Sequence, residues 1–439
     1  MFRSFALVTL LAFTVPSFAG TVTVITSFPK ELTAAYKAAF EKRHPDIKLE
    51  ILNKSTVASI AFVRETAAGQ RPDVFWASAP DAFEVLKRDR LLEKAADVVN
   101  PKVPAKIGNY PINDPEGFYF GQALAGYGIM ANTRYMKANK LEMPKEWTDL
   151  LKPQWFGHVA MTAPSRSGTM HLTVETILQG EGWDRGWNQI LQMAGNSAQI
   201  TERSFGVPDG INNGQFGAGP VIDFFGLAGK YSGFPVEFVY PQVTSIVPAN
   251  IALVAGAKNA AEARTFVRFA LSQEGQEILL DPKISRLPVL DYKAFGGRIP
   301  AGYPDPAAIA KRSKVQFNAD LSESRYSLVQ SIFDQTITFR LKELQAATRA
   351  IHDAEAKNAA KKNPQAAELL RQARELAFTP VVSAQIADSA EFQKLFASNK
   401  KEVEVAKRIT GLEETWNSKA RANYEKAAEL ARKAAALLA

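Results

Sequence analysis

Cysteine is absent from the 439-residue sequence. Its absence excludes disulfides, thiolate metal sites, thiol catalysis and lipid attachment through an N-terminal cysteine. Histidine is scarce, with four in the chain, and the sequence has no HExxH, P-loop or nucleophile-elbow motif. Because these motifs carry much of enzyme chemistry, we expect a protein that is not an enzyme and that holds no metal or cofactor.

Long apolar runs are missing after the first residues. Arg3 precedes an apolar stretch from Phe5 to Val15, and small residues follow up to Ala19, which is the pattern of a cleaved export signal over residues 1–19. No later segment reaches the roughly 18 consecutive apolar residues that indicate a membrane span. We therefore expect a soluble, periplasmic mature chain that is not embedded in the membrane.

Positive charge is only slightly in excess of negative charge. Lys and Arg number 53 against 45 Asp and Glu, a formal net charge of +8, and the basic residues are spread along the chain. A mildly basic balance favours an anionic partner. The lack of a basic cluster argues against nucleic acid as that partner.

Short strand-like runs alternate with helical runs from Gly20 to about Gln316. A β-branched run at 21–25 predicts a strand, and Leu32, Tyr36 and Phe40 then recur on one face of a helix. Further strands are expected over 47–51, 73–77, 157–161, 198–201, 219–224 and 243–254, and further helices from 57 and 80 and over 168–179 and 260–272. This alternation predicts an α/β fold built from parallel units.

The pattern after residue 243 returns to the style of the first units. This return predicts a discontinuous first lobe, 20–124 and 243–320, joined by two crossing strands to a second lobe, 125–242. Two consecutive independent domains remain the alternative, because periodicity alone does not separate the arrangements.

The strand pattern stops near residue 321. One apolar helical stripe from Val329 to Ile351 and later Ala-, Lys- and Glu-rich stretches predict an all-helical extension over 321–439. We expect these helices, over 365–377, 389–396 and 401–438, to dock against the lobes.

The segment Ser165-Arg166-Ser167-Gly168-Thr169 lies between a predicted strand and a predicted helix. Such a junction offers unpaired backbone N–H groups and the positive end of a helix dipole; hydroxyls add donors, and Arg166 can form a fork onto an oxyanion. The alternative is that Ser167 merely caps the helix and Arg166 is a surface charge. An arginine between two serines favours a phosphate or carboxylate site.

Ser27, Thr56 and Ser78 likewise stand between a strand end and a helix start. Open α/β sheets bind ligands at the carboxyl ends of their strands, so junctions on both lobes predict one shared cleft. Arg203 follows another strand and is a candidate second cation. Asp223 is a candidate acceptor for solute hydroxyls, with a helix cap or internal salt bridge as its alternative.

Ser165, His171 and Asp223 can also be written as a catalytic triad. His171 falls in the first turn of its helix, where it is either a ligand donor or a partly exposed polar residue. A histidine in such a place is more often structural than catalytic. Binding therefore remains the favoured interpretation.

Residues 20 to about 320 resemble the type II periplasmic solute-binding proteins of ABC transporters, in the ferric-iron-binding superfamily. The resemblance is carried, in order and spacing, by Asp73–Trp76, Gly126–Thr133, Glu146–Leu150, Gly157–Ala160 and Ser165–Thr169. It implies a two-lobed type II binding-protein fold with a C-terminal all-helical extension. By the same resemblance the cleft is lined by Ser27, Thr56, Ser78, Ser165, Arg166, Ser167, Gly168, Thr169, His171, Arg203 and Asp223.

Iron binders of this superfamily hold ferric ion with two adjacent tyrosines, and the matching positions here are Phe224 and Phe225. Phenyl rings cannot ligate iron, so ferric binding is a less favoured alternative. The chain looks most like relatives that bind hexose phosphates, phosphoglycerate or aminoethylphosphonate, which implies a monomer that hands a small anionic solute to an ABC transporter permease. Its extension looks like that of regulatory phosphoglycerate-sensing relatives, so signalling to the periplasmic domain of a sensor kinase is the alternative.

Overall fold

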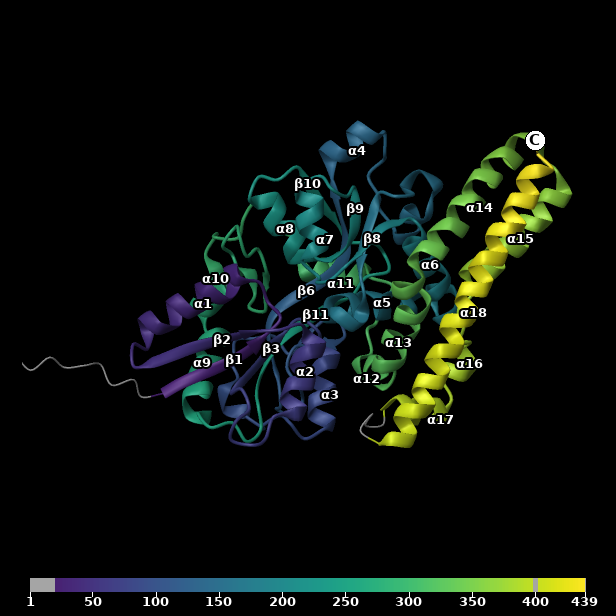
Figure 1. Cartoon of the computed structure of the whole chain (residues 1–439). Coiled ribbons are helices and arrows are strands. Elements are labelled where there is room, and N and C mark those ends of the chain that lie inside the picture. Colours follow the sequence, from purple (N-terminus) through teal and green to yellow (C-terminus); the bar gives the residue numbers. More distant parts are fainter. Residues whose placement is uncertain (1–19, 398–401, 439) are drawn as a thin grey trace, which may run out of the picture.

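The computed structural model describes residues 20–397 and 402–438, so the predicted export signal lies outside the described residues. Eight of the strands form a path in the order β2-β1-β3-β11-β6-β9-β7-β8 (Figure 1). Two further strands, β10 and β12 (Leu287–Pro288), pair with β6. The strands on this path are β1 (Gly20–Thr26), β2 (Ile47–Asn53), β3 (Val74–Ala77), β6 (Phe120–Asn132), β7 (Val159–Thr162), β8 (Ser197–Thr201), β9 (Ala218–Ile222) and β11 (Ile246–Leu253).

Strand β6 passes through both halves of this sheet. Its residues from Phe120 to Gly126 pair with β11, whereas those from Tyr127 to Ala131 pair with β9. We define the first lobe by β2, β1, β3, β11 and the start of β6, and the second by the rest of β6 with β9, β7, β8 and β10 (Val236–Val239). The predicted two-lobed α/β fold is confirmed, while the residue limits of the lobes stay a prediction.

Helices follow the strand ends, as the alternating pattern predicts. They are α1 (Lys30–Arg43) after β1, α2 (Thr56–Glu65) after β2, α3 (Pro80–Arg88) after β3, α5 (Gly168–Glu181) after β7, α7 (Gly206–Asn212) after β8 and α8 (Asp223–Tyr231) after β9. The remaining longer helices of the lobes are α4 (Thr133–Asn139), α6 (Trp183–Gly195), α9 (Ala260–Leu271), α10 (Gln273–Ile278) and α11 (Pro306–Arg312).

The strand predicted over 219–224 is too long at its C-terminal end. β9 ends at Ile222, and Asp223 begins α8. The Asp223 carboxylate accepts a hydrogen bond from the Gly126 backbone N–H at 2.7 Å, and a carboxylate in the first turn is favoured by the helix dipole. These two effects stabilise a helix start where local sequence favours continued strand.

Glycine explains why β6 is not evident from the sequence as one strand. Gly128 lies within it, and a Cβ atom there would stand 2.1 Å from the Val239 carbonyl oxygen of β10. Close backbone approach therefore requires glycine, although glycine weakens the strand pattern.

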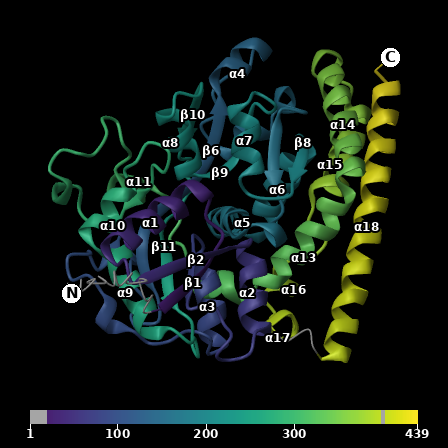
Figure 2. The same ribbon diagram turned by 60° about the vertical axis from the view of Figure 1, so that its left-hand side comes forward.

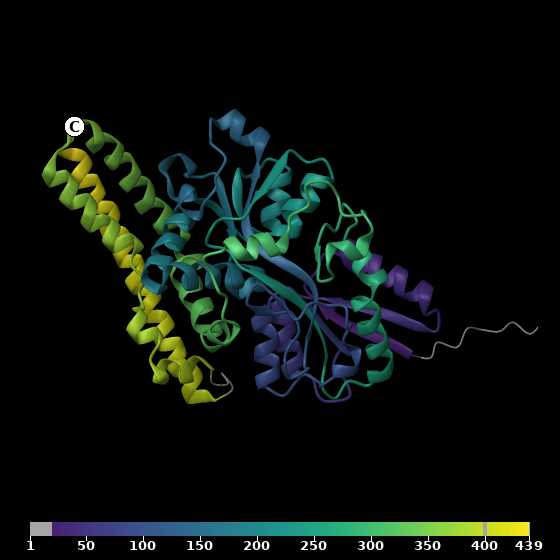
Figure 3. The same ribbon diagram turned by 180° about the vertical axis from the view of Figure 1, so that it is seen from behind.

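The helical extension begins with α12 (Ala319–Ser324) and docks on the lobes (Figures 1 and 3). Its other helices are α13 (Tyr326–Thr336), α14 (Leu341–Lys361), α15 (Pro364–Phe378), α16 (Ala384–Ala387), α17 (Ala390–Ala397) and α18 (Val403–Ala436). Figure 2 shows α18 running along the outer side of the molecule, and α18 packs on both α14 and α15.

The apolar stripe over 329–351 is wrongly predicted as one helix, because α13 ends at Thr336 and α14 begins at Leu341. The β-branched run Thr336-Ile337-Thr338 disfavours continued helix. Asn417 of α18 stabilises the break, since it donates to the Gln335 carbonyl at 3.3 Å and accepts from Arg340 at 3.0 Å.

Helix α13 completes the core of the second lobe. Leu328, Val329, Ile332 and Phe333 are buried in one apolar cluster together with residues of α5 and α6. The start of the extension is thus part of the folded second lobe. Among the described helices, none is long and apolar enough to cross a membrane.

Candidate solute-binding site between the lobes

A small cavity lies where helix N-termini of the two lobes face each other. The first lobe contributes Ser27, Phe28, Ser55, Thr56 and Ser78, and the second contributes Arg166, Ser167, Gly168, Thr169, Arg203, Ser204, Phe224 and Phe225. Within the described chain, no aspartate or glutamate lines this cavity. Two arginines and a set of hydroxyls therefore give it a positive, donor-rich wall.

Two helices begin at the cavity from opposite lobes. Ser55 caps α2 by accepting the Ala58 backbone N–H at 3.2 Å, and Ser167 caps α5 by accepting the Met170 N–H at 3.0 Å. The two N-termini lie close together, because a Cβ atom on Gly168 would stand 2.8 Å from the Thr56 side chain. Both helix dipoles place their positive ends here, which favours an anion.

Hydrogen bonds join the two lobes across the cavity. Ser78 and Thr169 share one between hydroxyls at 3.3 Å, and Arg203 donates to the Asn53 side-chain oxygen at 3.4 Å. The space left inside is about 10 Å³, room for one water molecule. The lobes must therefore move apart before a larger solute can enter.

The two arginines are not held by buried partners. Arg166 pairs at 3.1 Å with Glu202, whose side chain is 84% exposed, and such exposed pairs contribute little free energy. Arg203 lies over the Phe205 ring, and burial lowers the pKa of its guanidinium. Each side chain can turn toward an anion at small energetic cost.

Eight of the eleven predicted site residues line the cavity, and Ser165, His171 and Asp223 do not. Asp223 is fully buried beside it at the start of α8, where one carboxylate oxygen accepts from Gly126 N–H and from the Tyr240 hydroxyl. Burial raises the pKa of Asp223 to about 7. Its other oxygen has no hydrogen-bond partner within the described residues.

His171 is predicted to be either a ligand donor or a partly exposed residue, whereas the structure buries it completely, in contact with α3, α12 and α13. Its Nε2 lies 3.3 Å from both the Ser322 hydroxyl and the Asp81 carboxylate, and its ring packs against Tyr326. Burial lowers the pKa of His171 to about 3, so the ring is neutral. Its partners differ from those of Asp223, so the geometry does not support the triad interpretation.

We expect the stability of the protein to depend on pH through the buried Asp81. Burial raises its pKa to about 7 from 3.8, so the native state holds this proton at pH values where the unfolded chain has lost it. The contribution of the Asp81 proton to the free energy of unfolding is present in full below about pH 4. It is lost as pH rises through about 7. We expect Asp81→Asn to gain stability relative to wild type between about pH 5 and pH 8, on the order of 1–3 kcal/mol.

Urea unfolding of both proteins across this pH range measures that difference. The His171 ring is present in both proteins, so the comparison isolates Asp81. A difference that is constant with pH would contradict a raised pKa for Asp81.

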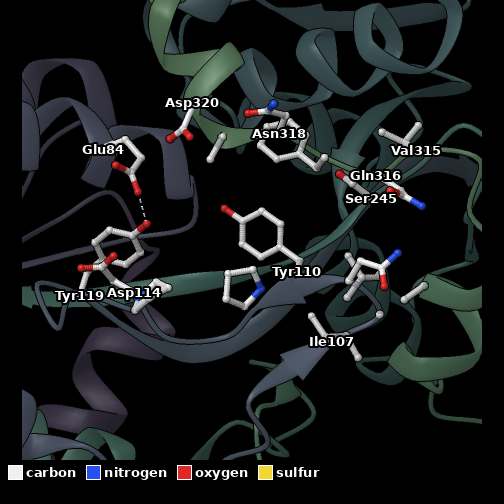
Figure 4. Close-up of a pocket in the computed structure, with 18 of the residues that line it drawn as sticks. Glu84, Ile107, Tyr110, Asp114, Tyr119, Ser245, Val315, Gln316, Asn318 and Asp320 are labelled. Atoms are coloured by element: carbon white, nitrogen blue, oxygen red, sulfur yellow. Dashed lines mark hydrogen bonds between the residues drawn. The ribbon is translucent and has the colours of Figure 1, made fainter.

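A larger cavity of about 1230 Å³ lies on another face, lined by α3, the β4–β5 hairpin (Lys106–Ile107 and Tyr110–Pro111) and the segment that leads into α12. Figure 4 shows Tyr110 projecting into it among Glu84, Asp114 and Asp320. Lys87 pairs with Asp114 at 3.0 Å, and Tyr119 donates to Glu84. Five carboxylates outnumber three cationic side chains in its described lining, which disfavours an anion, and the cavity contains no predicted site residue.

The positions that the resemblance assigns to iron-binding tyrosines hold phenyl rings, which cannot ligate iron. The side chains of Phe224 and Phe225 line the cavity at the positions where the resemblance places the iron-binding tyrosines, and their rings pack on each other. No group of three His, Asp or Glu side chains suited to a metal ion occurs in the described parts of the chain.

Comparison with known proteins places the chain in a family. Residues 69–304 match the family described as bacterial extracellular solute-binding protein. The phosphoglycerate transport regulatory protein PgtC of Salmonella typhimurium is 33% identical over 336 residues, which cover 75% of this chain and 80% of that protein. An uncharacterized protein of Haemophilus influenzae is 25% identical over 59% of this chain and 75% of its own length.

Solved structures of periplasmic binding proteins share the fold. AfuA of Actinobacillus pleuropneumoniae, solved with fructose-6-phosphate bound, has a TM-score of 0.63 at 20% identity and covers 73% of this chain and 99% of its own. Iron-bound HitA of Pseudomonas aeruginosa has a TM-score of 0.55 at 17% identity, over 70% and 99% of the two chains. The match over 69–304 and the identity to PgtC show that the chain belongs to the bacterial extracellular solute-binding proteins.

Proposed function

We propose that the interlobe cavity binds a small phosphorylated organic anion, which the protein delivers in the periplasm to the permease of an ABC importer. The observation that carries this proposal is the meeting of helix N-termini from both lobes at a cavity whose described lining has two arginines and no carboxylate. A phosphoryl group has several oxygens for these donors and a charge that both helix dipoles stabilise. PgtC, by its name, is a regulatory protein of phosphoglycerate transport, which supports the same ligand class.

Binding needs no covalent chemistry from the protein. The solute enters when the lobes are apart, and closure brings the N-termini of α2 and α5 to opposite sides of its anionic group. Because the arrangement with the Ser78–Thr169 hydrogen bond leaves room for one water molecule, the lobes stand further apart around the solute than in this structure. A permease can read this closed arrangement as the loaded state.

Sensing is a second candidate function, favoured by one contact. The Ser322 hydroxyl of α12 donates to Asp81 of the first lobe at 2.6 Å and lies 3.3 Å from His171 of the second lobe. Asp81 and His171 stand within three residues of Ser78 and Thr169, so the extension contacts both walls close to the cavity. A change in lobe separation would therefore change the extension, which could present that change to a sensor kinase.

A thermal-shift screen tests the proposed ligand class, because a ligand that binds the native state raises the melting temperature. The panel contains phosphate esters, phosphonates, dicarboxylates, inorganic phosphate, sulfate and ferric citrate. We expect concentration-dependent shifts with phosphate esters or phosphonates. Shifts confined to ferric citrate would overturn the proposal in favour of a metal site.

Arg166 provides a direct mutational test of the anion site. We expect Arg166→Ala to weaken binding of the best phosphate ester by roughly 1.5–3 kcal/mol, since a charge-assisted hydrogen bond is lost. Arg185→Ala is the matched control, because Arg185 is 72% exposed and pairs with Glu181 away from the cavity. Titration calorimetry measures both variants, and equal affinities would remove Arg166 from the site.

A further inference from the structure

Arg286 is a buried cation that nothing in the described chain neutralises by direct contact. Its side chain is 0% exposed, and none of its three guanidinium nitrogens has a hydrogen-bond partner within the described residues. A guanidinium carries five N–H donors, and leaving such a group buried and unpaired costs free energy. This cost would be offset by a bound ligand that accepts hydrogen bonds from the guanidinium.

The position of Arg286 connects it to the interlobe cavity. Its guanidinium carbon lies 4.0 Å from the centre of the Phe28 ring and 4.4 Å from that of Phe224. Both rings line the cavity, Phe28 from the first lobe and Phe224 from the second. Because the two rings belong to different lobes, the opening that admits a solute also separates them and uncovers the guanidinium.

The Arg286 guanidinium keeps its charge and its free donors although it is buried. Burial lowers its pKa to about 10, so it stays protonated at neutral pH, and the nearby Asp223 opposes part of this shift. Asp223 makes no hydrogen bond to Arg286 and keeps one carboxylate oxygen without a partner within the described residues. That oxygen is free to accept a hydrogen bond from a solute hydroxyl.

We infer that Arg286 is a second anion-binding residue of the cleft and binds a carboxylate of the solute while the helix N-termini bind its phosphate. This inference rests on the proposed function and narrows it to phosphate esters that also carry a carboxylate. The guanidinium fork matches the two oxygens of a carboxylate. A sugar phosphate without a carboxylate would leave the Arg286 guanidinium in contact with the two phenyl rings but without a hydrogen-bond partner.

Two ligands that differ in one group test this assignment. In glycerol 3-phosphate a hydroxymethyl group replaces the carboxylate of 3-phosphoglycerate. We expect wild-type protein to bind 3-phosphoglycerate about 10- to 100-fold more tightly, as a charge-assisted pair implies. We expect Arg286→Met, which keeps an apolar chain between the phenyl rings, to lower that preference to about threefold or less.

Arg298→Met is the matched control, because Arg298 is 58% exposed, pairs with Glu277 on the surface and should leave the preference unchanged. The melting temperature without ligand separates binding from structure. Removal of an unpaired buried charge should leave it equal or raise it, whereas a structural arginine would lower it on substitution.

The outcomes distinguish the two proposals. Equal wild-type affinity for both esters overturns the role of Arg286 and leaves the proposed function standing. Binding of neither ester, nor of any other phosphate compound, overturns both. Should Arg286→Met not fold, Arg286→Lys, which keeps the charge without the fork, replaces it and should show an intermediate preference, whereas an unchanged preference in that variant would overturn the role of Arg286.

Discussion

A chain that ends at Ser324 is expected to lose its stable fold. Truncation there removes α13, whose Leu328, Val329, Ile332 and Phe333 are buried in the core of the second lobe. The apolar faces of α5 and α6, including Trp187 at 0% exposure, would then contact water. Single buried Leu or Phe truncations cost about 2–5 kcal/mol each, so loss of the whole helix exceeds the stability of a typical domain.

Circular dichroism, size-exclusion chromatography and thermal melting of the truncated chain measure this effect. A second truncation after Lys362 keeps α13 and α14 and serves as the graded control, expected to be destabilised but folded. A monomeric protein with wild-type melting temperature after truncation at Ser324 would contradict a shared core and make the extension an independent domain.

Arg325→Met is the single substitution expected to destabilise the protein most. Arg325 donates to both oxygens of Glu175 in a pair whose side chains are 6% and 0% exposed. Its loss leaves a buried carboxylate without a counter-charge, a change that costs about 3–5 kcal/mol. The double variant Glu175→Met with Arg325→Met should recover most of this loss, because it removes both charges.

Arg371→Met is the matched control for a surface pair. Arg371 and Glu368 are 62% and 52% exposed, so the loss of their contact should change the free energy of unfolding far less than the loss of Arg325. Denaturant unfolding of the single and double variants gives the coupling free energy. Equal effects of Arg325→Met and Arg371→Met would show that burial of the Glu175 pair has no energetic consequence.

Local sequence patterns predict the α/β lobes well, because the periodicity of a strand or helix is set by residues that are close together in the sequence. The helices expected from 80 and over 168–179 are observed as α3 and α5. Patterns fail where distant contacts decide, as in β6, where close approach to Val239 imposes Gly128, and at Ile337, where Asn417 of α18 stabilises a helix break.

The same distinction holds in the site. The hydroxyl residues at strand-to-helix junctions predict the location of the cavity. They do so because the topology of the sheet brings the helix N-termini together there. The burial of His171 depends on the docking of α12 and α13. The sequence pattern around the strand-to-helix junction cannot predict that docking. Arg286 carries a weak local signal, an arginine inside the apolar run from Ile284 to Leu290, which becomes informative only beside Phe28 and Phe224.

A crystal structure of the mature protein grown with 3-phosphoglycerate tests the central claim most directly. The account predicts phosphorus between the N-termini of α2 and α5, with its oxygens accepting hydrogen bonds from Gly168 or Thr169 N–H and from Arg166 or Arg203. Phosphorus density in the acidic cavity beside Tyr110, or an interlobe cavity without phosphorus at saturating ligand, would contradict it.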